Sequence, residues 1–446
     1  MARPAPYSIK IRYDSILSLF LAIVMLAPVG IWNRYVFMES NLPFLLIPLI
    51  TAALIVSSGR IPKGITFPGV AVSFLLLILY AWVRLDNPWD LNVTIINLNP
   101  NAIRPGSSYV LDLIIFYFLF IIAAMLFYKR TRFSLCLWFA ICGYIIGFVI
   151  RNSLDIVALQ QGFNLSPGFV LVTLLPFVFL IHGNRNKMAF IPSVLLFFCI
   201  MWLGLIGARS AVAALLIFYI MMRAWPMITR SRLMYFSTFW GMVLLIACLT
   251  VLYLLYAITV PAGSMLKAPL VEGSDVGVLQ KSVGTRVEIW IHLAYLISQQ
   301  ALFGYGTDHL TSVLRPVAFI VFTLPRDNIE AHSLYFELLY RLGAIGLLGF
   351  ILIMFSIWRV FWSGREQWAV RVAGASLLCL LVYSSTGGFF VFNDLQLRSG
   401  FAWIILGIGA GASLRAMKDA RRRSSNRQSL WSPLPLTRVG GKPRTG

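Results

Sequence analysis

Charged residues are scarce in this chain. Asp, Glu, Lys and Arg make up 12% of its 446 residues, 59% are hydrophobic, and the mean hydropathy is +0.83. Soluble domains are about 25% charged, so the composition excludes that class and indicates a polytopic membrane protein. The net charge of +21 therefore does not point to nucleic acid, because Lys and Arg collect in the cytoplasmic loops of membrane proteins.

Motifs for metal or nucleotide binding are missing as well. The chain has four histidines, no Asp-x-Asp pair, no cluster of His and Cys, and no Walker loop. Its five cysteines lie inside apolar runs without metal-ligand spacing, so we expect small buried hydrophobic residues. These absences predict a site without metal or cofactor, in which arginine meets any phosphate charge.

What the chain has in abundance is long apolar runs. A membrane span needs about 20 mostly apolar residues, and the first run, near Asp14, is followed by no cleavage site and should remain as a signal anchor. The sequence predicts an all-α bundle of about twelve transmembrane helices within residues 1–414. The predicted spans are 15–31, 42–58, 65–83, 108–128, 133–150, 167–182, 188–206, 209–225, 233–260, 333–360, 368–389 and 399–414.

The basic residues predict how this bundle is oriented. With the N-terminus in the cytoplasm, 25 of the 37 Lys and Arg residues lie inside and 13 of the 16 acidic residues lie outside. Every short inside loop is then basic, as the positive-inside rule requires. Both termini are therefore predicted to be cytoplasmic.

Two long segments fall outside the predicted spans. Residues 415–446 are rich in Arg, Ser, Pro and Gly, and we expect a disordered cytoplasmic tail. Its basic cluster either fixes the topology or contacts anionic lipid headgroups. Residues 261–332 form a long outer loop between spans nine and ten, and loops of this length are usually functional. Helical spacing of apolar residues over 287–297 predicts an amphipathic interfacial helix there, and 310–325 is either re-entrant or interfacial.

Three residues at the outer face stand out: Arg209, Arg286 and His332. Taken singly, Arg209 could be an anchor for headgroups, and Arg286 and His332 ordinary loop residues. Together, two permanent cations and one titratable base at one membrane face indicate chemistry on a lipid-linked anionic substrate.

Further charged residues lie near the same face. Glu337 and Arg341 are spaced i,i+4 inside a span, where charges are costly and should face the bundle interior. They are either a structural pair or part of the site. Arg151 and Arg398, at the outer ends of spans five and twelve, are additional candidates.

The chain resembles the O-antigen ligase family of bacterial envelope glycosyltransferases. The resemblance covers the twelve spans, the loop between spans nine and ten, and three local patterns. These are an Arg-Ser-Ala opening of a span (Arg209), Arg-x-x-x-Trp followed by Gly-x-Gly (Arg286, Trp290, Gly304, Gly306), and His-Ser-x-Tyr followed by Gly-x-x-Gly (His332, Tyr335, Gly343, Gly346).

The resemblance implies a GT-C-like bundle in the bacterial inner membrane with a periplasmic active site. It implies metal-independent, inverting transfer of a glycan from undecaprenyl pyrophosphate to a sugar hydroxyl of lipid A–core. Arg209 and Arg286 would bind the pyrophosphate, and His332 would act as general base.

The remaining candidates receive secondary roles from the same resemblance. Trp290 and Tyr335 either stack on sugars or are interfacial aromatics, and Glu337, Arg341, Arg151 and Arg398 tune charge or orient His332. Two alternatives stay open. One is an O-antigen or exopolysaccharide polymerase that uses lipid-linked repeats as donor and acceptor. The other is a lipid-linked sugar transporter, although no internal repeat supports it.

Overall fold

The structure, a computed structural model, describes nine stretches of the chain. They are residues 67–85, 107–128, 167–182, 190–205, 209–259, 290, 293–306, 333–385 and 398–430. Within them all regular secondary structure is helical, as predicted. The predicted spans 15–31, 42–58 and 133–150 lie outside the described residues, as does the segment 310–325.

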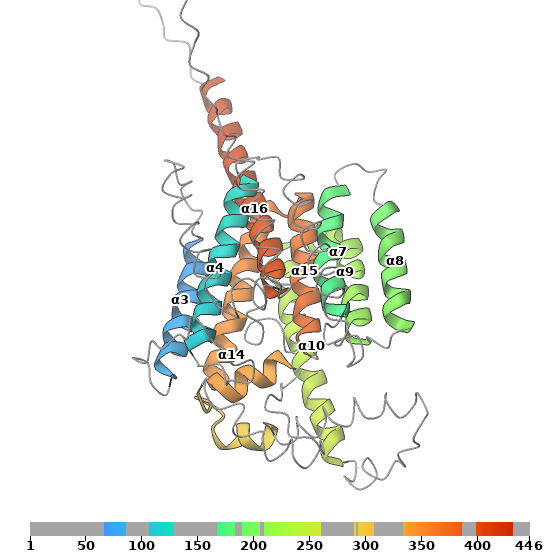
Figure 1. The fold of residues 1–446 in the computed structure, drawn as a ribbon. Coiled ribbons are helices and arrows are strands. Elements are labelled where there is room, and N and C mark those ends of the chain that lie inside the picture. The colour runs from blue at the N-terminus through green and yellow to red at the C-terminus, as the bar shows by residue number, and fades with distance from the viewer. Residues whose placement is uncertain are drawn as a thin grey trace, which may run out of the picture.

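Nine predicted spans coincide with helices (Figure 1). These are α3 (Pro68–Val83), α4 (Ser107–Tyr128), α7 (Pro167–His182), α8 (Phe190–Leu205), α9 (Arg209–Ile228), α10 (Arg232–Thr259), α14 (Leu334–Phe361), α15 (Trp368–Tyr383) and α16 (Arg398–Leu430). A short 3-10 helix, η3 (Trp362–Gly364), joins α14 to α15. Among the described residues, Arg209–Ile228, Arg232–Leu252 and Leu334–Gly364 are long and apolar enough to cross a membrane. The total of twelve spans stays a prediction.

Apolar side chains also cover much of the outer surface of these helices. Phe198 on α8 is 63% exposed and Leu244 on α10 is 64% exposed. Soluble monomers rarely expose large apolar patches. This surface suits contact with lipid and indicates an integral membrane protein.

Contacts between helices define two ends of the bundle. At the Trp358 end, Trp225 Nε1 donates to Arg365 O at 2.8 Å, and the rings of Tyr235 and Trp358 stack at 4.3 Å. At the opposite Ser333 end, at the bottom of Figure 1, Leu334 N donates to Ser384 O at 3.0 Å. The helix α9 ends and α10 begins at the Trp358 end, so these two helices run in opposite directions, as the predicted topology requires.

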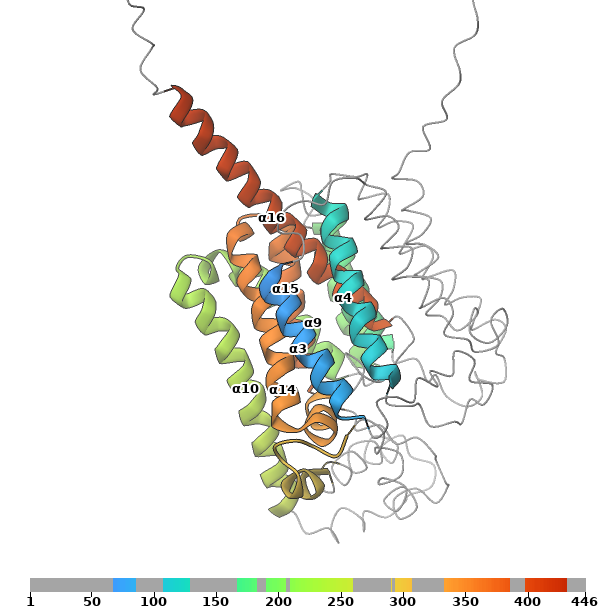
Figure 2. The same cartoon turned by 90° about the vertical axis from the view of Figure 1, so that its left-hand side faces the viewer.

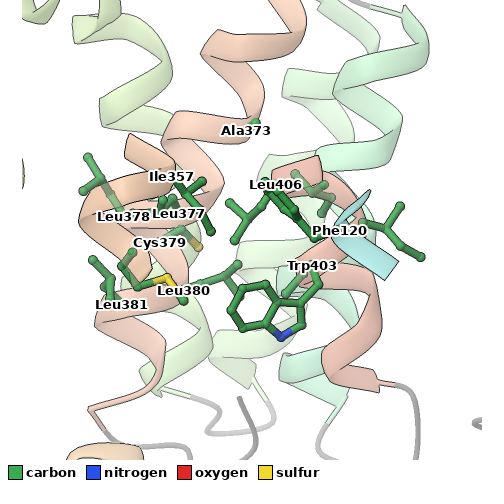
Figure 3. Packing of buried hydrophobic residues seen from close by; sticks show 14 of the residues in the cluster. Phe120, Ile357, Ala373, Leu377, Leu378, Cys379, Leu380, Leu381, Trp403 and Leu406 are labelled. Atoms are coloured by element: carbon green, nitrogen blue, oxygen red, sulfur yellow. The ribbon is translucent and has the colours of Figure 1, made fainter. Parts of the chain in front are cut away.

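Glycines let the last helix pack against α4 and α15. A Cβ on Gly407 or Gly411 of α16 would overlap a backbone carbonyl of α4, and one on Gly409 would overlap Ala373 of α15. Small residues at such positions allow membrane helices to approach closely. Figure 3 shows Trp403 and Leu406 of α16 beside Phe120 of α4, with apolar residues of α15 across the core. The helix α16 therefore lies at the centre of the bundle.

The same helix is longer than the sequence predicted. We expected no regular structure beyond Arg415, but α16 continues to Leu430 and projects past the other helices (Figure 2). The reason is local: the segment after Gly411 is rich in Ala and Arg, which favour helices, and contains no Gly or Pro before Pro433. Residues 431–446 lie outside the described residues.

A candidate functional site at the Ser333 end

The first turns of α14 are bonded to the end of α15. Leu334 N donates to Ser384 O at 3.0 Å, and the Tyr335 hydroxyl donates to Leu381 O at 2.6 Å. These bonds fix the position of Ser333, which directly follows His332 in the chain. Tyr335, a predicted sugar-stacking residue, thus also has a defined bond to the neighbouring helix.

Glu337 and Arg341 form the ion pair that their spacing predicted. Arg341 Nε lies 3.2 Å from Glu337 Oε1, and the two side chains are 4% and 0% exposed, respectively. Both charges face the protein interior, as expected for charges inside a span.

Two residues after Arg341, at Gly343, α14 breaks. Gly343 has φ 64° and ψ −166°, which divides α14 into a short arm (334–342) and a long arm (344–361). A positive φ of this kind favours glycine. The break leaves carbonyls at the end of the short arm and N–H groups at the start of the long arm without partners inside the helix.

Residues 301–306, here called the strap, bond to these backbone groups. Tyr305 N and Gly306 N donate to carbonyls of the short arm, Tyr340 O and Arg341 O, at 2.8 and 2.9 Å. In the other direction, Ala344 N and Ile345 N of the long arm donate to strap carbonyls, Ala301 O and Leu302 O, at 2.8 and 3.3 Å. The strap therefore completes the hydrogen bonding that the break interrupts.

Two glycines make this contact possible. A Cβ on Gly304 would lie 2.5 Å from Gly343 N, and one on Gly343 would overlap the carbonyl of Leu302. Gly304 also has a positive φ, 70°. The Gly-x-Gly pattern after Arg286 and the Gly-x-x-Gly pattern after His332 thus meet in one contact between the strap and the break.

The helix before the strap packs on the short arm. The ring of Trp290 stacks on Phe336 with centroids 5.4 Å apart, and both Trp290 and Leu293 are buried. Trp290 and residues 293–299 are helical, as the spacing of apolar residues predicted. Arg286 lies four residues before Trp290 in the sequence.

Tyr80 of α3 and Arg84, which directly follows the last residue of α3, contact the strap and were not predicted. Arg84 Nη2 donates to Gly304 O at 2.6 Å. The Tyr80 hydroxyl lies 3.1 Å from both Phe303 O and Leu342 O. The sequence signal that singled out Arg209 is an arginine at the outer end of a predicted span. Arg84 carries the same signal and could have been predicted from it.

The other predicted site residues fall into two groups. Arg209 is exposed at the first position of α9, and Arg398 is the first residue of α16; both helices start at the Ser333 end. Arg151, Arg286 and His332 lie outside the described residues. The structure therefore brings together Trp290, Tyr335, Glu337 and Arg341 around the short arm, and starts α9 and α16 at the same end.

Comparison with known families addresses the sequence motifs directly. The family model described as O-antigen ligase matches residues 191–351. We call this matched region, residues 191–351, the O-antigen ligase domain. The resemblance predicted from the motifs is confirmed, and the domain contains Arg209, Arg286 and His332.

The O-antigen ligase domain begins in α8 and ends in the long arm of α14, so α3, α4, α15 and α16 lie outside the matched residues. The family implies glycosyltransferase-like activity on lipid-linked glycans. A search of curated proteins found none that matches this chain.

Proposed function

We propose that this protein transfers a glycan from undecaprenyl pyrophosphate to a sugar hydroxyl of lipid A–core at the periplasmic face of the inner membrane. One observation carries the proposal. The glycine motifs that follow Arg286 and His332 are bonded to each other, at the end of the bundle where α9 begins with Arg209. The segments that follow Arg286 and His332 in the chain and the start of α9 therefore lie at one end of the bundle, which supports the proposal.

In the proposed reaction, an acceptor hydroxyl attacks the anomeric carbon of the donor sugar. The bond from that carbon to the pyrophosphate oxygen breaks, and undecaprenyl pyrophosphate leaves with inverted configuration at the sugar. His332 takes the hydroxyl proton as general base. Arg209 and Arg286, which stay protonated, bind the pyrophosphate and stabilise the charge that develops as it leaves.

The test is transfer in vitro by the purified protein in nanodiscs, with a defined undecaprenyl-pyrophosphate glycan. Two acceptors compete in the same reaction: lipid A–core and a second lipid-linked repeat. Glycosylated lipid A–core is the expected product. Elongation of the lipid-linked repeat instead would identify a polymerase, and no transfer to either acceptor would favour transport of the lipid-linked glycan.

Variants test the roles of the three residues. His332→Ala should lower kcat by about 10²- to 10⁴-fold while donor binding persists. Arg209→Ala and Arg286→Ala should weaken donor binding and lower kcat by about 10²-fold or more. Lysine should substitute poorly at either position because it lacks the planar fork.

Matched controls exist for both residue types. His182 lies at the end of α7, and Arg232 begins α10 at the Trp358 end as Arg209 begins α9 at the other. His182→Ala and Arg232→Ala should transfer at the wild-type rate. Full activity of His332→Ala would refute its role as base, and activity that EDTA abolishes and Mg²⁺ restores would refute metal independence.

A further inference from the structure

The strap is attached to α14 by the stack of Tyr305 on Tyr340, with centroids 5.1 Å apart, and by backbone hydrogen bonds. Leu302 and Phe303 are 54% and 53% exposed, so their side chains add little burial that would hold the strap in place. Four backbone bonds join the strap to α14, and the carbonyls of Phe303 and Gly304 face α3 instead. The position of the strap thus depends on α3 as well as on α14.

The contacts from α3 differ in kind and act together. The Arg84 guanidinium gives a charge-assisted bond to Gly304 O at 2.6 Å, which is stronger than a neutral bond. The Tyr80 hydroxyl is equidistant, at 3.1 Å, from one strap carbonyl and from Leu342 O at the end of the short arm. Tyr80 therefore links the strap to the end of the short arm, and Arg84 holds the strap glycine, Gly304, that packs against the break.

We infer that Tyr80 and Arg84 are positioning residues for glycan transfer: they hold the strap on the break in α14, and thereby position the described segments that follow Arg286 and His332 in the chain. This inference rests on the proposed function. Both residues lie outside the matched O-antigen ligase domain, so the site depends on a helix that the family match does not include. Catalytic groups must be held closely, since a displacement of about 1 Å can cost roughly 10²-fold in rate.

The test uses the full-length protein with Tyr80→Phe, Arg84→Gln and the double variant. Each single variant should lower kcat at saturating donor and acceptor by about 10-fold or more. The double variant should be no worse than about the poorer single variant, because both residues act on one strap. Arg84→Lys, which keeps one charged donor, should recover most of the lost rate.

Ser73→Ala is the matched control. Ser73 also lies on α3, and its hydroxyl is 3.1 Å from the Ser356 hydroxyl of α14, away from the strap. The Ser73→Ala substitution removes a hydrogen bond between the same two helices and should leave kcat unchanged. A loss of rate in Ser73→Ala equal to that in Tyr80→Phe would mean that general helix packing, and not the strap, sets the rate.

Hydrogen–deuterium exchange gives a readout independent of transfer. The amides of Tyr305 and Gly306 donate to short-arm carbonyls and should exchange faster in Tyr80→Phe and Arg84→Gln, but not in Ser73→Ala. Wild-type kcat in Tyr80→Phe would overturn the inference. Strict additivity of the rate losses in the double variant would also overturn it. A loss of rate in Arg84→Gln but not in Tyr80→Phe would overturn it too, because Arg84 would then be a direct ligand of the donor.

The two failures are distinguishable. If the wild-type protein transfers to lipid A–core while Tyr80→Phe is fully active, the inference fails and the proposed function stands. If the wild-type protein transfers to no acceptor, the proposed function fails and the positioning role fails with it, whatever the exchange rates show.

Discussion

Glu337 and Arg341 form a buried ion pair in the short arm of α14, directly before the break. Moving two charges out of water is costly, and their attraction offsets that cost only while both are present. The pair therefore contributes to stability as a unit, and its removal is best tested one side at a time.

Removing one partner should destabilise the protein more than removing both. Arg341→Met leaves Glu337 as an uncompensated buried charge, and we expect a loss of about 3–5 kcal/mol. The double variant Glu337→Leu with Arg341→Met should recover most of that loss. Thermal unfolding in detergent, followed by the fluorescence of a thiol-reactive dye on buried cysteines, measures both. Equal destabilisation in the single and double variants would contradict this account.

At the residue scale the sequence predicted this pair but not Tyr80 and Arg84. The i,i+4 spacing of Glu337 and Arg341 is visible in the sequence and requires only a helix. The partners of Tyr80 and Arg84 are backbone carbonyls of Phe303, Gly304 and Leu342. Every residue has a backbone carbonyl, so the sequence does not indicate which carbonyl accepts such a bond. These contacts can be identified only from the folded structure.

The break in α14 is the main feature at the scale of the element. The sequence around it, RLGAIGLLG, has glycines at 343, 346 and 349, and each is compatible with a continuous membrane helix. Only Gly343 takes a positive φ, because the strap bonds to the groups exposed there. Hydropathy predicted where this helix begins and ends, but a contact with residues 301–306 decides where it breaks.

Gly343→Ala should disrupt this element. The residue has φ 64°, where a side chain costs roughly 1–3 kcal/mol, and its Cβ would overlap the Leu302 carbonyl. We expect lower yields of folded protein and loss of transfer, measured by size-exclusion profile and by the in vitro assay. Gly241→Ala is the control, because nothing lies within 4 Å of a Cβ at that position of α10. A Gly343→Ala protein that folds and transfers normally would show that the break is dispensable.

At the scale of the whole molecule, alternation of helix direction agrees with the topology predicted from charge. Arg84, Arg209, Ser333 and Ser384 lie toward one end. The basic extension of α16 lies toward the other end (Figure 1). Hydropathy predicts the positions of the described helices, because lipid acts on every span, whereas the orientation derived from charge stays a prediction. The order in which helices pack side by side depends on small-residue contacts that a single sequence does not reveal.

Labelling of single cysteines tests this orientation. In a chain whose five native cysteines are replaced by serine, Gln299→Cys should react with a membrane-impermeant maleimide in intact spheroplasts. Ser424→Cys should react only after permeabilisation, because it lies on the basic extension of α16. Both positions are exposed, so accessibility of the side chain does not limit either reaction. The opposite pattern of labelling would invert the topology and remove the proposed site from the periplasmic face.

The contact between α4 and α16 has a consequence for biogenesis. The face of α4 around Phe120 and Ala124 accepts Gly407 and Gly411 of α16 at backbone distance, yet α16 leaves the ribosome long after α4. Until α16 is synthesised, this face of α4 lacks the helix that packs against it. Completion of the bundle thus requires synthesis of α16, and a chain interrupted before Arg398 lacks the helix that packs on this face of α4.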